Sequence, residues 1–212
     1  MTEQIKAVME NLEKNNMSAF YAETKDDVLP IIKSLLPDGC SVSIGGSVTL
    51  DQCKVREFLE NGNYNYLDRY DPSLDGAAMQ ALFVRALSAD AYISSTNALT
   101  SDGKLYNVDG GGNRIGAICY GPKSVIIVAG KNKIVKDVDE AIKRVKTVAA
   151  PKNCVRLSRD TYCAKMGKCV AADDNYGGCG SDGRICSTYM VTSHQNFPGR
   201  IKVIIVNENL GY

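Results

Sequence analysis

The segment Ser124–Ala129 limits the possible folds of this chain more than any other feature of its sequence. Its residues are almost uniformly apolar. Such a strand is buried on both faces, as the strands of parallel sheets are when other elements cover them. Strands that alternate with helices along the rest of the chain would build that arrangement. The first expectation is therefore a parallel or mixed sheet between two layers.

The remaining hydrophobic pattern supplies this alternation. Apolar residues recur at helical spacing, or helix-forming runs occur, in residues 1–14, 26–36, 49–61, 76–87 and 136–148. Short strands are predicted at 18–23, 41–44, 64–67, 91–93, 189–193 and 202–207. We therefore predict one doubly wound α/β domain over residues 1–212, with a mostly parallel sheet and helices on both faces. A cysteine-rich segment, residues 150–188, interrupts the pattern within that domain.

Charge and composition exclude several classes of partner. The chain has 212 residues, and its 25 basic residues nearly cancel its 24 acidic ones, which leaves a net charge of +1. No global field therefore favours nucleic acid or an anionic membrane surface. The N-terminal segment lacks the apolar core of a signal peptide, and no 18-residue apolar run occurs. We expect a cytoplasmic protein whose eight cysteines are reduced.

A first glycine-rich loop follows the predicted strand 41–44. Gly45 and Gly46 allow backbone N–H groups to approach an oxyanion, and Ser47 and Thr49 carry hydroxyl donors at the start of a helix. The alternative is that Ser47 or Thr49 only caps that helix. The loop matches neither of the glycine patterns that bind ATP or NAD, so no NAD or ATP site is predicted.

A second polar cluster begins after the predicted strand 91–93. Asp102-Gly103 is expected to turn a hairpin between Ala98-Leu99 and Leu105-Tyr106. The glycines of the run 109–114 allow unusual backbone conformations, and Arg114 could form a bidentate pair with a carboxylate or phosphate. The candidate ligand-binding residues of this cluster are Asn97, Thr100, Asp102, Gly103, Asn107, Gly110, Asn113 and Arg114. Asp102 and Asp109 are the candidate catalytic acids or bases.

Four cysteines near the C-terminus are the candidate metal ligands. Cys163, Cys169, Cys179 and Cys186 are separated by five, nine and six residues among several glycines, Gly177 included. Thiolate-only ligation suits Zn²⁺ or an iron–sulfur cluster. Free or redox-active thiols are the alternative, and Cys154 could be a fifth or substitute ligand.

Other reactive side chains are expected to have structural or solvated positions. Cys40, Cys53 and Cys119 lie in or beside predicted core elements, and His194 is the only histidine. No spacing of a hydrolase triad surrounds that histidine. Lys123, Lys131 and Lys133 flank the apolar strand; each could reach an anion, but we expect them to be solvated.

Several of these segments together resemble the LUD-domain family of lactate-utilisation proteins, formerly called DUF162. The matching segments are 45–50, 61–65, 109–114, 121–128, 149–151, 163–169, 183–186 and 211–212, which span nearly the whole chain. The resemblance implies a fold similar to the NagB/RpiA/CoA-transferase group, with a ligand pocket at the carboxyl ends of the parallel strands. Members similar to lactate-utilisation protein C are tied to the oxidation of lactate to pyruvate alongside iron–sulfur oxidoreductase subunits. This chain departs from the family by inserting residues 170–178 between Cys169 and Cys179, which leaves the identity of the metal open.

The sequence therefore supports three functional hypotheses. The first is a LUD-type protein that binds a small carboxylate or phosphorylated metabolite at the glycine-rich loops, beside a four-cysteine metal site. The second is an iron–sulfur electron-transfer or assembly subunit without catalysis of its own. The third is a structural protein in which the cysteines hold zinc and contribute only folding energy.

Overall fold

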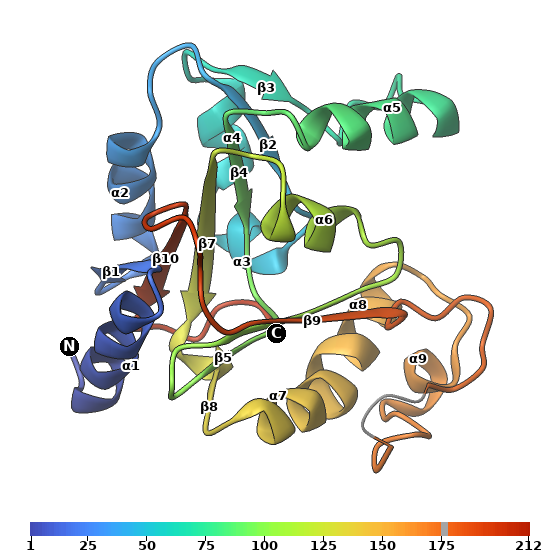
Figure 1. The fold of residues 1–212 in the computed structure, drawn as a ribbon. Coiled ribbons are helices and arrows are strands. Elements are labelled where there is room, and N and C mark those ends of the chain that lie inside the picture. The colour runs from blue at the N-terminus through green and yellow to red at the C-terminus, as the bar shows by residue number, and fades with distance from the viewer. Residues whose placement is uncertain (175–177) are drawn as a thin grey trace.

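The architecture centres on a parallel sheet of six strands in the order β1-β10-β7-β4-β2-β3. A computed structural model describes residues 1–174 and 178–212 of the chain. All neighbouring strands of this sheet are parallel, and the last strand in sequence, β10, lies between β1 and β7 (Figure 1). The strands are β1 (Ser18–Ala22), β2 (Ser41–Ile44), β3 (Asn65–Leu67), β4 (Ala91–Ser94), β7 (Ser124–Gly130) and β10 (Ile201–Val206). The predicted α/β class and parallel sheet are confirmed.

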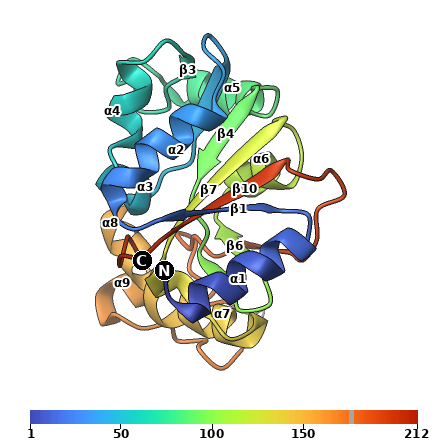
Figure 2. The ribbon, with the colours of Figure 1, turned by 90° about the vertical axis from the view of Figure 1, so that its left-hand side faces the viewer.

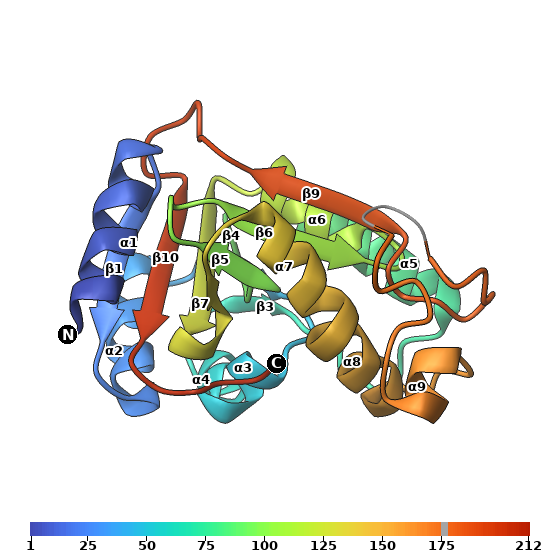
Figure 3. The ribbon, with the colours of Figure 1, turned by 90° about the horizontal axis from the view of Figure 1, so that it is seen from below.

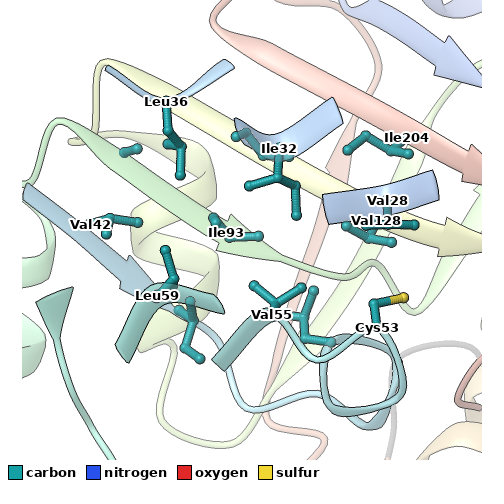
Figure 4. Packing of buried hydrophobic residues seen from close by; sticks show 14 of the residues in the cluster. Val28, Ile32, Leu36, Val42, Cys53, Val55, Leu59, Ile93, Val128 and Ile204 are labelled. Carbon is teal, nitrogen blue, oxygen red and sulfur yellow. The ribbon is translucent and has the colours of Figure 1, made fainter. Parts of the chain in front are cut away.

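Alternate residues of the central strands point to opposite layers, because side chains along a strand alternate between its two faces. Ile126 and Val128 of β7 pack with α2 (Val28–Leu35), α3 (Val48–Gln52) and α4 (Val55–Glu60). Figure 2 shows these helices on one side of the sheet, and Figure 4 shows Ile32, Val55 and Leu59 packed against Ile93 and Val128.

The neighbouring residues of β7, Val125 and Ile127, face the other layer. They pack with α1 (Glu3–Lys14), α6 (Asn113–Cys119) and residues of β5 and β6. Because both faces are covered, β7 needs apolar residues at every position, which explains its uniform composition. Burial on both faces confirms the expectation from the sequence.

A second, four-stranded sheet in the order β8-β5-β6-β9 was not expected from the sequence. Its strands are β5 (Ala98–Thr100), β6 (Leu105–Asp109), β8 (Ile134–Val135) and β9 (Thr188–Thr192). β5 and β6 form the predicted hairpin, and β9 adds antiparallel to β6. α7 (Val138–Arg144) packs against β5, β6 and β8 (Figure 3). This sheet was missed because its strands are short and its pairing joins segments far apart in the chain.

Two predicted helices have different bounds in the structure. The predicted helix 49–61 is divided into α3 and α4, because Lys54 adopts a left-handed conformation with φ of 56°. The predicted helix 136–148 does not end before Ala150: a π-helical turn, η3 (Val145–Ala149), joins α7 to α8 (Ala150–Arg156). Pro151 lies in the first turn of α8, directly after that π-helical turn. The interruption expected at residue 150 therefore begins after α8.

The remaining helices are short or capped by local side chains. α5 (Gly76–Ala86) starts at Asp75, whose carboxylate accepts a hydrogen bond from the Ala78 N–H group. The others are α9 (Tyr162–Met166) and the 3₁₀ turns η1 (Lys25–Asp27) and η2 (Lys131–Lys133). No helix in residues 1–174 or 178–212 combines the length and apolar composition needed to cross a membrane.

Replacing Ile93 with alanine is expected to lower the free energy of unfolding by about 2 to 5 kcal/mol, because Ile93 is fully buried and the change leaves a cavity. Val84 on α5 is 59% exposed, so Val84→Ala should change stability by less than about 0.5 kcal/mol. Urea denaturation of the two variants measures both values. Equal losses would contradict the described layer packing.

Candidate functional site

A cavity of about 400 Å³ lies where β2, β4 and β7 end. The residues that follow these strands line it: Ser47 after β2, Ser95 after β4 and Lys133 after β7. α6, α8 and the C-terminal Tyr212 complete the wall. The carboxyl ends of parallel strands are the usual place for a ligand in open α/β sheets, so this cavity is the candidate site.

One guanidinium group, that of Arg114 on α6, organises the wall of this cavity. Its Nε and Nη2 lie 2.9 Å and 2.7 Å from Asp109 Oδ1. Nη1 donates to the Ser95 carbonyl and to Asn107 Oδ1, at 2.9 Å and 2.6 Å. Nη2 also donates to Asn97 Oδ1 at 2.7 Å and to the Val108 carbonyl at 3.0 Å. One side chain thus ties together the segment that joins β4 to β5, the strand β6 and α6.

This network gives Arg114 a different role from the bidentate anion contact suggested by the sequence. Every N–H direction of the guanidinium already points to a protein acceptor. The side chain still lines the cavity and carries a positive charge there. Direct binding of an anion by Arg114 stays a prediction, and the observed geometry makes it a positioning residue.

Two amides near Arg114 are placed differently. Asn97 lines the cavity, and its Oδ1 also accepts from the Val108 N–H group at 2.9 Å. Its Nδ2 has no hydrogen-bond partner in the described part of the chain, so that donor is available to a ligand. Asn107 is fully buried, and its Nδ2 finds no partner among the residues that the structure describes. Asn107 does not line the cavity.

The first glycine-rich loop forms one edge of the site. Gly46, Ser47 and Thr49 line the cavity, while Gly45 lies directly behind it. A Cβ on Gly45 would lie 2.9 Å from Ser94 Oγ and 3.2 Å from Arg114 Cδ, so the absence of a side chain permits this close packing. Ser47 caps α3 by accepting from the Leu50 N–H group at 3.4 Å, so its helix-capping alternative is also realised.

The second cluster is divided by the hairpin. Asp109, Gly110 and Asn113 line the cavity, and the Asp109 carboxylate accepts from Arg114 and from the Ile115 N–H group. Thr100, Asp102 and Gly103 instead lie at the turn between β5 and β6, outside the cavity lining. That turn is held against α1, where the Asn15 side chain donates to the carbonyl groups of residues 102 and 103. Of the two candidate catalytic carboxylates, only Asp109 therefore faces the site.

Lys133 is buried in the cavity wall, contrary to the solvated position expected from the sequence. Its side chain turns inward because η2 follows β7 directly at the carboxyl edge of the sheet. Nζ donates to Thr49 Oγ1 at 2.9 Å, to Ser95 Oγ at 2.8 Å and to the Thr96 carbonyl at 3.2 Å. Burial lowers the pKa of Lys133 to about 7, with smaller contributions from Arg144 and Arg114 in the same direction.

Three further arginines face the cavity, and none was identified from the sequence. Arg69 lies over the Phe83 ring, 5.0 Å from its centroid. Arg156 on α8 is held by Asn153 Oδ1, which accepts from its Nε at 3.0 Å. The side chain of Arg159 makes no hydrogen bond or ion pair within the described residues, although its backbone N–H donates to the Cys154 carbonyl. These arginines lie after a strand or at a helix end, and only the strand order brings them to one cavity.

The four candidate metal ligands lie on and after α9. Cys163 is buried in α9, and its Sγ is 3.4 Å from Thr161 Oγ1. A hydrogen bond from Cys179 to Ser181 Oγ, at 3.2 Å, lowers the pKa of the Cys179 thiol. Burial raises the pKa of Cys186, and Cys169 and Cys179 are close enough to add to that effect. The thiols thus influence one another across the segment.

The described thiols do not form a closed ligand set. Within residues 1–174 and 178–212, no three His, Cys, Asp or Glu side chains are grouped closely enough to hold a metal ion. Residues 175–177, which include Gly177 of the inserted loop between Cys169 and Cys179, lie outside the described residues. Burial raises the pKa of Cys154 to about 11, and its thiol is hydrogen-bonded to Thr161 and Cys163. The four-cysteine metal site stays a prediction.

The fold and the cavity define the class of this protein: an α/β protein with a parallel central sheet and a largely basic cavity at the carboxyl ends of its strands. The LUD-domain family profile matches residues 5–206, so the chain belongs to the LUD-domain family. This membership supports a protein of the lactate-utilisation type.

One solved structure supports the fold. A DUF162 family protein from Deinococcus radiodurans is similar over 97% of each chain, with a TM-score of 0.52 and 16% sequence identity. Two Chaetomium thermophilum proteins are more distant. For eIF2B beta the TM-score is 0.36 and the identity 15%, and the match covers 54% of this chain and 44% of that protein. For eIF2B delta the TM-score is 0.36 and the identity 14%, and the match covers 54% of this chain and 49% of that protein. No curated protein matched the sequence.

Replacing Arg114 with methionine is expected to lower the free energy of unfolding by about 3 to 5 kcal/mol, because the buried Asp109 carboxylate and two amide oxygens would lose their donor. Lys104 pairs with Asp102 at 2.6 Å on the surface, so Lys104→Met should cost less than about 1 kcal/mol. Chemical denaturation of both variants measures the difference. A small loss for Arg114→Met would contradict its role as the organising residue.

Proposed function

We propose that the cavity binds a small anionic metabolite, a carboxylate or a phosphorylated compound, within a lactate-utilisation-type protein. The observation that carries this proposal is the charge of the lining. Among the described side chains of the cavity, one acidic residue, Asp109, faces five basic ones: Arg69, Arg114, Lys133, Arg156 and Arg159. The acidic group is already paired with Arg114. The remaining positive charge has no acidic partner in the cavity, which favours an anionic ligand.

The shape and the neutral donors of the cavity fit the same ligand class. Its volume of about 400 Å³ lies within the usual range for small-molecule sites. Asn97 Nδ2 and the hydroxyl of Ser47 offer hydrogen bonds beside the arginines. Gly46 lies next to the guanidinium of Arg69, because a Cβ on this glycine would be in van der Waals contact with Arg69 Cζ, at 3.7 Å. A ligand here would meet both charged and neutral hydrogen-bond donors.

Single replacement of Arg69 or Arg156 with alanine is expected to weaken binding of pyruvate or inorganic phosphate at least about tenfold, because each removes a charged hydrogen-bond donor worth about 1.5 kcal/mol or more. Isothermal titration calorimetry of the whole chain measures the change. Arg85→Ala is the matched control, since Arg85 is exposed on α5 and does not line the cavity. Equal binding by all variants, or no binding of either anion by the wild type, would contradict the proposal.

We also propose that Cys163, Cys169, Cys179 and Cys186 bind zinc or an iron–sulfur cluster. The proximity of Cys169 and Cys179 to Cys186 supports this proposal, although the described positions do not by themselves form a ligand set. Iron–sulfur would support an electron-transfer role beside oxidoreductase subunits, whereas zinc would support a structural one.

Protein purified without oxygen is expected to contain zinc, or iron with acid-labile sulfide, and to lose that metal in Cys163→Ser and Cys179→Ser. Elemental analysis with a visible spectrum distinguishes the two metals, because thiolate-bound iron–sulfur clusters are coloured and zinc is not. Cys119→Ser is the control, since that exposed thiol lies outside the cysteine-rich segment. Metal-free wild-type protein would overturn the proposal.

A further inference from the structure

Lys133 differs from the other cations of the cavity in its surroundings. It is 3% exposed, yet no carboxylate in the described residues lies within ion-pair distance of its amine. Its three hydrogen-bond acceptors are two neutral hydroxyls, from Thr49 and Ser95, and the Thr96 carbonyl. A buried lysine is normally paired with an acid, so a lysine held only by neutral groups at a cavity requires another explanation.

The charged and titratable groups around the amine favour its neutral form. Burial is the main cause that lowers the pKa of Lys133 to about 7. Arg144 on α7 and Arg114 on α6 act in the same direction, while Cys53 at the end of α3 acts weakly against them. A sizeable fraction of the amine is therefore unprotonated near neutral pH, and an unprotonated lysine is a nucleophile toward carbonyl carbon.

We propose that Lys133 forms a Schiff base with a small carbonyl compound that also carries an anionic group, such as a 2-oxo acid or a ketose phosphate. This inference rests on the proposed function, because the arginines of the cavity would hold the anionic group while the amine meets the carbonyl. Lys133 lines the cavity together with Arg69, Arg156 and Arg159, so one small ligand can face both kinds of group.

The covalent step needs no further reactant. The nitrogen lone pair attacks the carbonyl carbon, the C=O π electrons move to oxygen, and a proton passes from nitrogen to that oxygen to give a carbinolamine. The C–O bond then breaks as a C=N bond forms, and the oxygen leaves as water with the two protons that the amine carried. Thr49 and Ser95, whose hydroxyls lie 2.9 Å and 2.8 Å from Nζ, are placed to relay these protons.

To test this, the whole chain is incubated with one carbonyl compound: pyruvate, glyoxylate or dihydroxyacetone phosphate. Sodium cyanoborohydride is present to reduce any imine to a stable amine. Peptide mass spectrometry then locates the adduct. At pH 7 the adduct on Lys133 is expected to exceed that on Lys131 at least about tenfold, because an ordinary lysine is almost fully protonated there. Labelling of Lys133 should rise as the pH passes through about 7. Lys131 is a matched control in the same 3₁₀ turn, exposed and hydrogen-bonded to Asn207.

Two variants separate this inference from the anion site itself. Lys133→Arg keeps a cation but cannot form an imine, so it should bind pyruvate or phosphate in calorimetry and give no adduct at residue 133. Lys131→Met should be labelled at Lys133 as the wild type is. The wild-type peptide map decides the question even if Lys133→Arg does not fold. Anion binding without an adduct at Lys133, or equal labelling of Lys133 and surface lysines, would overturn the Schiff base and leave the anion site standing. Absence of both binding and adduct would overturn both proposals.

Discussion

The guanidinium of Arg114 is the interaction on which the candidate site depends. The Asp109 carboxylate, the side-chain amides of Asn97 and Asn107 and the Ser95 carbonyl all accept from it, so the end of β4, the hairpin and α6 share one donor group. Buried polar groups of this kind are costly unless each finds a partner. Arg114 gives several of these acceptors their donor at once, so part of the cavity wall is held by contacts within the protein, and such preorganisation lowers the entropic cost of binding.

Once Asp109 is committed to Arg114, the cavity has an excess of positive charge. Arg69 and Arg156 are held by an aromatic ring and by an amide, respectively, rather than by acids. Lys133 is a further basic residue of the cavity, and its amine contacts the hydroxyl groups of Thr49 and Ser95. Neutral partners fix the positions of these side chains and leave their charge available. The anion site and the reactivity proposed for Lys133 therefore have the same physical origin.

The extent to which the site could be predicted differs from one residue to the next. Ser47 and Asn97 were found because glycine-rich and amide-rich loops after buried strands have a recognisable composition. Asp102 has the same kind of neighbours in sequence as Asp109, but the β5–β6 hairpin carries it to the opposite end, against α1. Lys133 resembled any surface lysine beside a strand. Local composition does not contain the strand order, and the strand order decides which loops meet.

By itself, the sequence determined the layers and the family. The apolar residues of β7 predict its burial on both faces, and Asp102-Gly103 predicts the hairpin. These features depend on periodicity and turn chemistry, which neighbouring residues encode. Only the tertiary structure decided that β10 enters between β1 and β7, that Arg114 is bound within the protein and that Lys133 is buried. Those outcomes depend on contacts between residues that are distant in the chain. Such contacts form, and contribute to the free energy of folding, only when the sheet has assembled.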